Sequence, residues 1–286
     1  MLTGKTDDPD VLLKLAAEAA LEAGAEIMNV YGGDHFSIRI KADDSPVTIA
    51  DLGADNIIFT LLSESGLPVL SEERAPVPYK ERRSWKRFWL VDPLDGTKEF
   101  ISRNGEFTVN IALIEDSEPL AGVVYAPVSD VLYAGIVGGD AWRFDRARDT
   151  ALSGWPAAGR PLPCVRKSGY GIVASRSFPD DLTLAFIDEF ISRYPGTQVV
   201  NRGSSLKLCM LAEGSADIYP RFRNISEWDT AAGHAVLLAS GGSMVQAANP
   251  GRQLVYNKEE SRNPWFIACR DQALLDAVLD MIPTAS

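Results

Sequence analysis

The segment from Phe88 to Phe100 most constrains the fold of this 286-residue chain, because an apolar run is followed at once by two carboxylates. The run 88–91 predicts a buried strand. Asp92 and Asp95 stand three positions apart across a proline, and the glycine that follows permits backbone conformations that other residues avoid. A short helix is expected next, and its free N–H groups beside two acids suit a hard cation and a phosphate. An ordinary Asp-Pro and Asp-Gly turn is the alternative.

The N-terminal half is predicted to contain two helices and an antiparallel sheet. Apolar residues at helical spacing predict a helix over 10–30 that stops at the Gly32-Gly33 pair. A second helix is expected to begin at Thr48, since Asp51 three positions later is typical of a capping pair. The predicted strands, of which the last four form an antiparallel meander, are 36–41, 68–70, 106–115, 119–127, 131–137 and 141–144.

The C-terminal half is predicted to alternate strands and helices, which is α/β order. A stretch rich in Pro, Gly and Ala over 145–168 predicts a connection between two halves, residues 1–160 and 161–286. The expected strands are 171–175, 197–200, 216–219 and 266–269, and the expected helices are 180–193, 204–213, 229–240 and 271–282.

Composition and charge exclude several functions. No apolar run approaches the roughly 20 residues that span a bilayer, and acidic residues at 7, 8 and 10 argue against a signal peptide. A formal charge of −11 gives no general attraction for nucleic acid polymers. Three widely spaced cysteines indicate reduced thiols in a cytosol-like compartment and no zinc site. The two histidines, His35 and His234, are too few for a histidine-rich metal site, and each is expected to be a surface or structural residue.

Four acidic positions share one pattern, because each lies at the end of a predicted strand or the start of a predicted helix. They are Asp51, Glu72, the Asp92 and Asp95 pair, and Asp229. Each has a simpler alternative: helix capping for Asp51 and Asp229, a turn for the pair, and a solvated charge run for Glu72. Carboxylates held together repel one another unless Mg²⁺ or a similar ion neutralises them. The pattern therefore favours metal-assisted hydrolysis of a phosphate ester.

Two motifs carry a family resemblance. The segments 89–97 (Trp-Leu-Val-Asp-Pro-Leu-Asp-Gly-Thr) and 228–233 (Trp-Asp-Thr-Ala-Ala-Gly) resemble the two signatures of the inositol monophosphatase superfamily of Mg²⁺-dependent, lithium-sensitive phosphatases. A closer likeness, to the 3′(2′),5′-bisphosphate nucleotidases of CysQ type, rests on residues 41–48, 95–100, 203–207 and 219–222. The resemblance covers nearly the whole chain, and 145–168 departs from it by being longer than in the compact members.

The resemblance implies a mixed α+β and α/β fold, the layered αβαβα sandwich of inositol monophosphatase and fructose-1,6-bisphosphatase. It also implies two or three Mg²⁺ ions and a role for each matching residue. The implied metal ligands are Glu72, Asp92, the backbone carbonyl of Leu94, Asp95 and Asp229. Thr97, held by Asp51, would help Glu72 orient the attacking water. The phosphate would sit on the backbone N–H groups of Gly96 and Thr97.

Contacts with the substrate are implied for a wider set of side chains. The candidates are Lys41, Lys98, Ser175, Arg176, Lys207 and Arg221 for the rest of a nucleotide, and Glu72, Leu94, Asp95, Gly96, Thr97 and Asp229 around the phosphate. Each cation or hydroxyl group of the first set has the alternative of lying solvated at the surface. No cysteine or histidine lies near the acidic positions in sequence, so attack by water without a phosphoenzyme is expected.

The leading hypothesis is an Mg²⁺-dependent 3′(2′),5′-bisphosphate nucleotidase that converts adenosine 3′,5′-bisphosphate to AMP and phosphate, a nucleotide-recycling role in sulfur assimilation. An inositol or sugar phosphate monoesterase of the same fold is the alternative, and a non-catalytic regulator that binds metal or nucleotide is a third. The complete set of acids with Thr97 argues against the regulator. The expected partner is a small phosphorylated nucleotide. The protein is expected to be a monomer or homodimer, cytoplasmic or peripheral on the inner face of the cell membrane.

Overall fold

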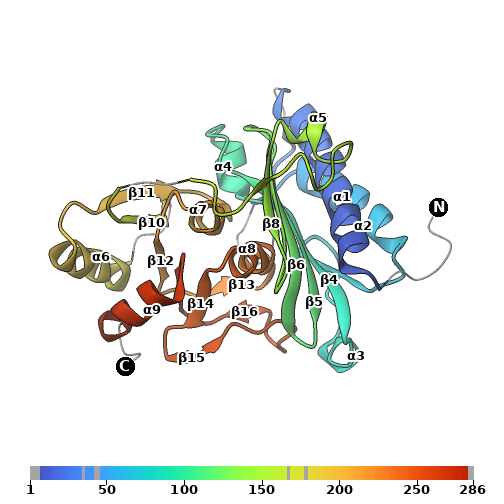
Figure 1. Ribbon diagram of the computed structural model, residues 1–286. Coiled ribbons are helices and arrows are strands. Elements are labelled where there is room, and N and C mark those ends of the chain that lie inside the picture. Colours follow the sequence, from blue (N-terminus) through green and yellow to red (C-terminus); the bar gives the residue numbers. More distant parts are fainter. Residues whose placement is uncertain (1–6, 34–35, 42–45, 166–167, 177–179, 283–286) are drawn as a thin grey trace.

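The computed structural model describes residues 7–33, 36–41, 46–165, 168–176 and 180–282. These residues form five layers in the order helices, sheet, helices, sheet, helices (Figure 1). The predicted αβαβα sandwich is therefore confirmed. His35 and most of the turn predicted at 43–46 lie outside the described residues.

The first layer consists of two helices packed on one face of the first sheet. α1 (Pro9–Tyr31) begins at Asp8, whose side chain accepts a backbone hydrogen bond from the first turn. α2 (Ile49–Ser63) begins at a capping box formed by Thr48 and Asp51, as the sequence predicted. The two helices bury one face of the sheet, and they set the position of Asp51 relative to the strands below.

The first sheet has seven strands in chain order, and every neighbouring pair except β3 and β4 is antiparallel. Its strands are β3 (Val69–Ser71), β4 (Arg87–Asp95), β5 (Thr108–Glu115), β6 (Glu118–Ala126), β7 (Val131–Ile136), β8 (Ala141–Asp145) and β9 (Arg160–Pro161). The predicted meander is confirmed. The stretch 145–168 is more than a connection, because it also contains the short helix α5 (Ala147–Thr150) and the edge strand β9.

β4 shows why the central segment is apolar without alternation. Trp89 and Val91 face the layer of α1 and α2, whereas Phe88 and Leu90 face the layer between the two sheets. A strand that is buried on both faces needs apolar residues at every position. β4 also continues past its predicted end at residue 91, as far as Asp95.

Short elements flank the end of β4. β1 (Arg39–Ile40) and β2 (Pro46–Val47) pair as a separate two-stranded sheet, so the strand predicted over 36–41 is shorter than expected. α3 (Tyr79–Arg82) precedes β4, and the predicted short helix α4 (Thr97–Ile101) follows it. The residue between β4 and α4 is Gly96, with a φ of 93° that side chains rarely permit.

The second sheet has six strands in the order β11-β10-β12-β17-β14-β15. β10 pairs in parallel with β11 and β12, as the α/β order predicted, and the other pairs are antiparallel. The strands are β10 (Gly171–Ser175), β11 (Gln198–Arg202), β12 (Ile218–Arg221), β14 (Ser243–Gln246), β15 (Asn249–Gln253) and β17 (Phe266–Cys269). The hairpin of β14 and β15 was not predicted, nor was the small sheet of β13 (Ile225–Ser226) and β16 (Arg262–Asn263).

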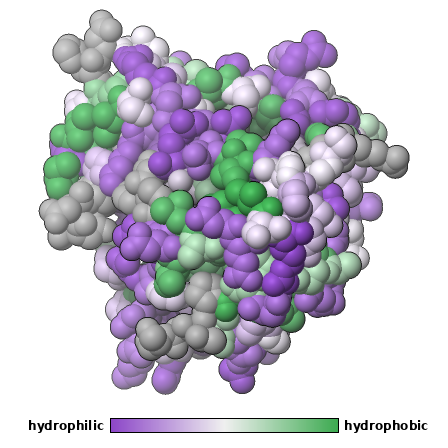
Figure 2. Space-filling model, turned by 90° about the vertical axis from the view of Figure 1, so that its left-hand side faces the viewer, coloured by the Kyte–Doolittle hydropathy of each residue, from purple (hydrophilic) through white to green (hydrophobic). Residues whose placement is uncertain are grey.

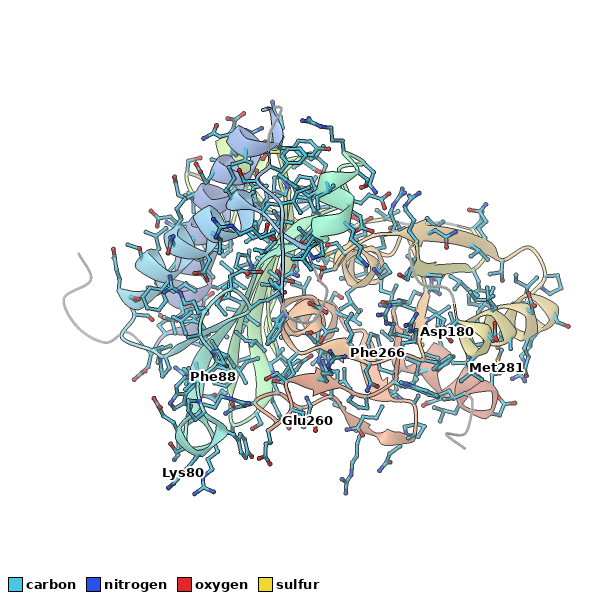
Figure 3. The ribbon with its side chains drawn as sticks, turned by 180° about the vertical axis from the view of Figure 1, so that it is seen from behind. Lys80, Phe88, Asp180, Glu260, Phe266 and Met281 are labelled. Carbon is cyan, nitrogen blue, oxygen red and sulfur yellow. The ribbon has the colours of Figure 1, made fainter. Side chains whose placement is uncertain are left out.

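The remaining helices lie on the two faces of the second sheet. α7 (Leu206–Glu213) and α8 (Trp228–Ala239) lie between the sheets. α6 (Asp181–Arg193) and α9 (Gln272–Val278), which is followed by a 3₁₀ turn (Leu279–Met281), cover the outer face. Figure 3 shows this separation, with Phe266 inside the molecule and Met281 beside the outer helices.

α8 packs very closely on the first sheet, and this contact matters because α8 carries Asp229. A Cβ atom added at Gly122 on β6 would lie 2.4 Å from the carbonyl oxygen of Ala232 on α8. Only glycine permits so close an approach of a strand to a helix. This contact therefore fixes the distance between the N-terminal part of α8 and strand β6.

Both sheets share the apolar core of the central layer. The first sheet ends with β9 and the second begins with β10, but the division into domains 1–160 and 161–286 stays a prediction. The face of the molecule toward α6 is mostly hydrophilic, with hydrophobic residues in separate groups (Figure 2). Within the described ranges, no helix combines the length and the apolar character needed to cross a bilayer.

Candidate active site

Parallel pairing of β3 and β4 brings the first two acids together. Ser71 on β3 is in register with Val91 on β4, and the backbone N–H of Glu72 donates to the carbonyl of Val91 at 3.1 Å. Glu72 and Asp92 therefore follow directly from neighbouring strand positions. The register of β4 against β5 then shifts between Asp92 and Asp95, which is a bulge that redirects both side chains.

α8 supplies the third acid from the opposite side. One carboxylate oxygen from each of Glu72, Asp92 and Asp229 lies within 4.8 Å of the others. Asp92 is almost fully buried, and the other two side chains are partly exposed. Ser205 Oγ contacts both the Asp95 carboxylate and the backbone carbonyl of Asp229, and burial together with the charge of Asp95 raises the pKa of Asp92 and Asp229. We therefore call the four residues together the acid cluster. The structure thus brings together all four acids that the sequence selected for metal binding.

Internal hydrogen bonds fix the orientation of the carboxylates. Asp92 Oδ1 accepts from the backbone N–H of Leu94 at 3.0 Å, and Asp229 Oδ2 accepts from the backbone N–H of Ser226 at 3.1 Å. Asp95 Oδ2 accepts from the backbone N–H and the hydroxyl of Ser205, at 2.7 and 2.8 Å. Each of these acids is therefore held through one oxygen by the chain itself, which pre-organises the cluster.

The carboxylates of the acid cluster lie close together and at least partly buried, which makes their charged forms unfavourable without a cation. Burial raises the pKa of Asp92 and of Asp229 well above the usual carboxyl range, and the charges of Glu72 and Asp95 add to this rise. Burial also raises the pKa of Glu72, although Lys41 acts in the opposite direction. A divalent cation would remove this repulsion. An oxygen-only donor set at this spacing fits Mg²⁺ better than it fits a softer metal.

Asp51 serves both of the purposes that the sequence left open. Its Oδ2 caps α2 by accepting from the backbone N–H of Thr48 at 2.7 Å and from the Thr48 hydroxyl at 2.5 Å. Its Oδ1 accepts from the Thr97 hydroxyl at 3.1 Å. Burial raises the pKa of Asp51, while the hydrogen bonds from Thr48 and Thr97 favour its charged form. Capping and orientation of Thr97 are therefore two uses of one carboxylate.

Lys41 lies at the acid cluster and not beside the cationic substrate candidates. Its ammonium donates to Glu72 Oε1 at 2.8 Å and also bonds Glu73. Burial lowers the pKa of Lys41, but the two glutamates outweigh this effect and raise it overall. Burial raises the pKa of Glu73 to about 7, against the lowering effect of Lys41. Glu73 was not selected from the sequence, where it looked like part of a charge run.

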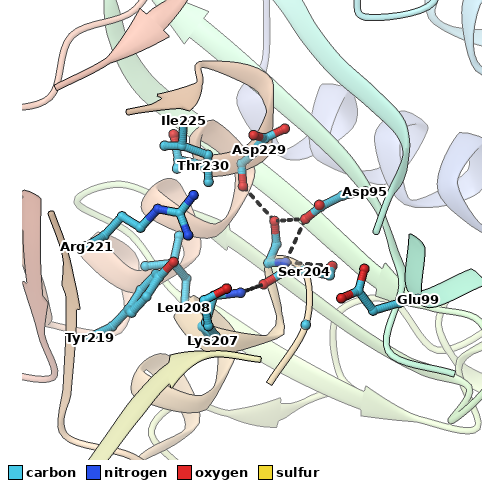
Figure 4. Close-up of a pocket in the computed structure, with 13 residues that line it drawn as sticks. Asp95, Glu99, Ser204, Lys207, Leu208, Tyr219, Arg221, Ile225, Asp229 and Thr230 are labelled. Carbon is cyan, nitrogen blue, oxygen red and sulfur yellow. Dashed lines mark hydrogen bonds between the residues drawn. The ribbon is translucent and has the colours of Figure 1, made fainter. Parts of the chain in front are cut away.

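A pocket opens from the acid cluster toward the second sheet (Figure 4). Asp95, Glu99 and Asp229 line one end of it, and Lys207 and Arg221 line the other. Ser175 at the end of β10 also lines it. The sequence candidates Ser175, Lys207 and Arg221 are thus brought together around one cavity that is anionic at one end and cationic at the other.

Besides Lys41, two further substrate candidates lie outside this pocket. Arg176 is exposed and bonds Glu106, with its Nε 3.0 Å from Oε2 and an Nη atom 2.7 Å from Oε1. It lines a neighbouring depression near α6 instead of the pocket at the acid cluster. Lys98 is exposed on α4. Contact of either side chain with substrate stays a prediction.

The sequence reasoning did not assign the residues that join the two halves at this site. Asn110 Nδ2 donates to Ser205 Oγ at 2.8 Å, and Ser205 Oγ lies 2.7 Å from the backbone carbonyl of Asp229. One serine on the second half therefore links Asp95 and Asp229. Two signals were available: Asn110 interrupts an apolar strand, and Ser205 falls within the motif 203–207.

His234 has the structural role that the sequence predicted. It is fully buried on α8, and its Nδ1 lies 2.9 Å from the hydroxyl of Tyr256. Burial lowers the pKa of His234 to about 3, so the ring is neutral at physiological pH.

Comparison with known proteins gives a consistent result. The model of the inositol monophosphatase family matches residues 8–269. The chain is 45% identical over 259 residues to the 3′(2′),5′-bisphosphate nucleotidase CysQ of Salmonella typhimurium, which covers 89% of this chain and 98% of that protein. It is 44% identical, with the same coverage, to the protein of the same name from Escherichia coli K12.

Solved structures extend the similarity to the fold. CysQ from Bacteroides thetaiotaomicron, described as a bacterial member of the inositol monophosphatase family, matches with a TM-score of 0.84 and 41% identity over 92% of this chain and 99% of that one. The extragenic suppressor protein SuhB from Bartonella henselae matches with a TM-score of 0.73 over 96% of this chain and all of that one, at 21% identity. The SuhB match supports the fold alone.

Proposed function

Because this chain belongs to the inositol monophosphatase family, we propose that its acid cluster and pocket hydrolyse the 3′-phosphate of adenosine 3′,5′-bisphosphate to give AMP and phosphate. The relatives named as 3′(2′),5′-bisphosphate nucleotidases match nearly the full length of the chain at 44–45% identity. The prediction of an enzyme of that type is confirmed by this similarity. The choice of a bisphosphate nucleotide as the substrate is argued below from the residues that line the pocket.

One observation carries the proposal: the pocket has opposite charges at its two ends. Asp95 and Asp229 lie at one end, where a phosphate ester needs cations beside it. Lys207 and Arg221 lie at the other end, where a second anionic group can bind directly. A substrate with two phosphates matches both ends, whereas inositol or sugar monophosphates leave the cationic end unpaired.

We propose that the site would hold two or three Mg²⁺ ions. Their ligands would be the side chains of Glu72, Asp92, Asp95 and Asp229 and the backbone carbonyl of Leu94. Bound there, Mg²⁺ would supply neutralisation of the phosphate and of the departing ester oxygen. Its fit is argued from the crowded, partly buried, oxygen-only donor set. Three of the four acids are also held by internal hydrogen bonds, so they need no reorganisation before they bind a cation.

Thr97 and Asp51 are proposed to orient the attacking water. The Thr97 hydroxyl donates a hydrogen bond to Asp51 Oδ1. The lone pairs of the Thr97 oxygen are then free to accept a hydrogen bond from water. Glu72 is proposed as a second acceptor for the same water. Water held by two acceptors presents its oxygen toward the phosphorus, which is the arrangement that in-line attack needs.

The backbone N–H groups of Gly96 and Thr97 are proposed to hold the phosphate. The left-handed φ of Gly96 turns the chain sharply between β4 and α4. A Cβ atom at Gly96 would lie 3.1 Å from the carbonyl oxygen of Glu106, so the turn is tightly packed. We expect hydrolysis by direct attack of water without a phosphoenzyme.

The test is phosphate release from adenosine 3′,5′-bisphosphate, inositol 1-phosphate and fructose 1,6-bisphosphate, measured side by side with Mg²⁺. The proposal expects the largest kcat/KM for the nucleotide. A larger kcat/KM for inositol 1-phosphate or for fructose 1,6-bisphosphate would favour the alternative of an inositol or sugar phosphate monoesterase. No release from any of the three would favour a non-catalytic regulator. A cytoplasmic location also stays a proposal, supported by three cysteines that form no disulfide in the described structure.

A further inference from the structure

The cationic end of the pocket contains the buried hydroxyl group of Tyr219, which none of the described charged residues around it bonds. The side chain of Tyr219 lines the pocket and is 2% exposed. Within the part of the chain that the structure describes, its hydroxyl oxygen has no hydrogen-bond partner. Figure 4 shows the Tyr219 ring between Arg221 and Lys207, with the hydroxyl directed into the pocket.

The fold holds this ring in place. Side chains alternate along β12, so Ile218 packs in the core beneath the outer helices while Tyr219 and Arg221 face the central layer. Phe266 on β17 contacts the Tyr219 ring edge to face, with centroids 5.4 Å apart and planes at 86°. On the pocket side, the Lys207 ammonium lies 5.4 Å from the ring centroid. These contacts leave the hydroxyl little freedom to find another partner.

The surroundings of the hydroxyl indicate what it would bind. A buried hydroxyl without a partner is costly unless a ligand supplies one. The Nε of Arg221 is also buried without a partner among the described residues. The Lys207 ammonium donates to the carbonyl of Ser204 at 2.6 Å and to that of Arg202 at 3.3 Å, which fixes its position. We call Lys207, Tyr219 and Arg221 the donor wall, since all three offer hydrogen atoms to an acceptor.

We propose that the Tyr219 hydroxyl donates a hydrogen bond to the phosphate that the substrate keeps, and that it thereby helps to select bisphosphates over monophosphates. This inference rests on the proposed function. Two cations attract any nearby anion, because the attraction between charges depends on distance and little on orientation. A rigid, neutral O–H group between them can donate only to an oxygen at one place. It therefore adds geometric selection to electrostatic attraction.

Tyr219→Phe tests the proposal, because it removes one oxygen atom and leaves the ring packing unchanged. Binding of AMP to the full-length protein in Mg²⁺ buffer, measured by isothermal titration calorimetry, should weaken by roughly ten- to a hundred-fold, the size of one hydrogen bond to a charged group. Thermal stability should be unchanged or slightly higher, since an unpaired buried hydroxyl is lost.

Tyr133→Phe is the matched control. Tyr133 is also buried, but its hydroxyl donates to Glu213 Oε2 at 2.7 Å and lies on β7, outside the pocket. This variant should lose stability and keep AMP affinity, which is the opposite of the result for Tyr219→Phe.

Three outcomes would overturn the inference: AMP affinity unchanged in Tyr219→Phe, an equal rise in KM for inositol 1-phosphate, or no measurable binding of AMP to the unmodified protein. Kinetics separate it from the proposed function. Tyr219→Phe should raise KM for adenosine 3′,5′-bisphosphate by a similar factor with little change in kcat, and should leave inositol 1-phosphate hydrolysis unaffected. If the unmodified protein released no phosphate from the bisphosphate while Tyr219→Phe still weakened AMP, the proposed function would fail and the donor role would stand.

Discussion

The acid cluster and the donor wall lie at opposite ends of one pocket and are built in different ways. The acid cluster takes Glu72, Asp92 and Asp95 from the first sheet and Asp229 from α8, so it forms only when both halves pack together. The donor wall comes from α7 and β12 of the second half alone. The two ends should therefore respond separately to substitution, the acid cluster through kcat and the donor wall through KM.

The largest effect is expected at the acid cluster. Asp95→Asn keeps the shape of the side chain and its bond from Ser205, but it removes a charge that a bound cation needs. Turnover should fall on the order of 10³-fold or more. The metal-free protein should remain folded and gain stability, because one source of carboxylate repulsion is lost. Near-normal kcat in steady-state assays would remove Asp95 from the proposed ligands.

Thr97→Ala should lower kcat by about 10²–10⁴-fold with a much smaller change in KM, because an orienting contact acts mainly in the transition state. Asp51→Asn should lower kcat similarly, and the double variant should be little worse than either single one, since the two residues act as a unit.

Asp51→Asn should also cost about 0.5–2 kcal/mol in free energy of unfolding, because the same carboxylate caps α2. Thr97→Ala lacks this second role and provides the control. Measurement of kcat and of urea unfolding for all three variants checks the pair. Multiplicative rate losses would contradict a shared role for Thr97 and Asp51.

At the donor wall, Arg221→Gln should raise KM for the bisphosphate by about 10–100-fold and leave kcat within a few-fold, since it removes a charged hydrogen bond to a group that does not react. Arg252→Gln, at an exposed position on β15, is the charge-matched control and should change neither constant. An equal fall in kcat would show that the two ends are not separable.

The smallest effect is expected for Arg176→Gln. Its guanidinium bonds Glu106 and lines the depression near α6, outside the pocket at the acid cluster. We expect less than about a five-fold change in KM for the bisphosphate. A change as large as that of Arg221→Gln would instead support the sequence-based prediction that Arg176 contacts the substrate.

The sequence predicted the acid cluster better than the donor wall, and the physical reason lies in the backbone. Asp92 and Asp95 follow an apolar strand within one short motif, and parallel pairing of strands makes the position of Glu72 follow from the same pattern. Tyr219 shares its motif with Arg221, yet a tyrosine in an apolar strand is usually core. Only the packing of β12 against α7 shows that its hydroxyl is directed into the pocket.

The long elements of the fold were also predictable, whereas the short pairings were not. α1, α2 and the meander follow from periodicity over many residues. β9 and the pair of β13 and β16 have two residues each, too few for any period to be visible. Asn110 and Ser205 each stand out in the sequence, but their contact with one another and with Asp229 depends on tertiary packing, which no local pattern shows.

Thermal unfolding with and without Mg²⁺ across pH tests most directly whether the acid cluster is a cation site. Burial and mutual repulsion raise the folded-state pKa of Asp92 and Asp229 above their unfolded values. Their contribution to stability is therefore fully present below an unfolded pKa of about 4 and is lost as pH rises through the folded values.

We predict that the EDTA-treated protein loses Tm as pH rises above the usual carboxyl range, and that Mg²⁺ restores it most at the highest pH. Asp95→Asn should reduce both the loss and the restoration. A Tm that Mg²⁺ leaves unchanged at every pH would contradict the assignment of this cluster as the metal site.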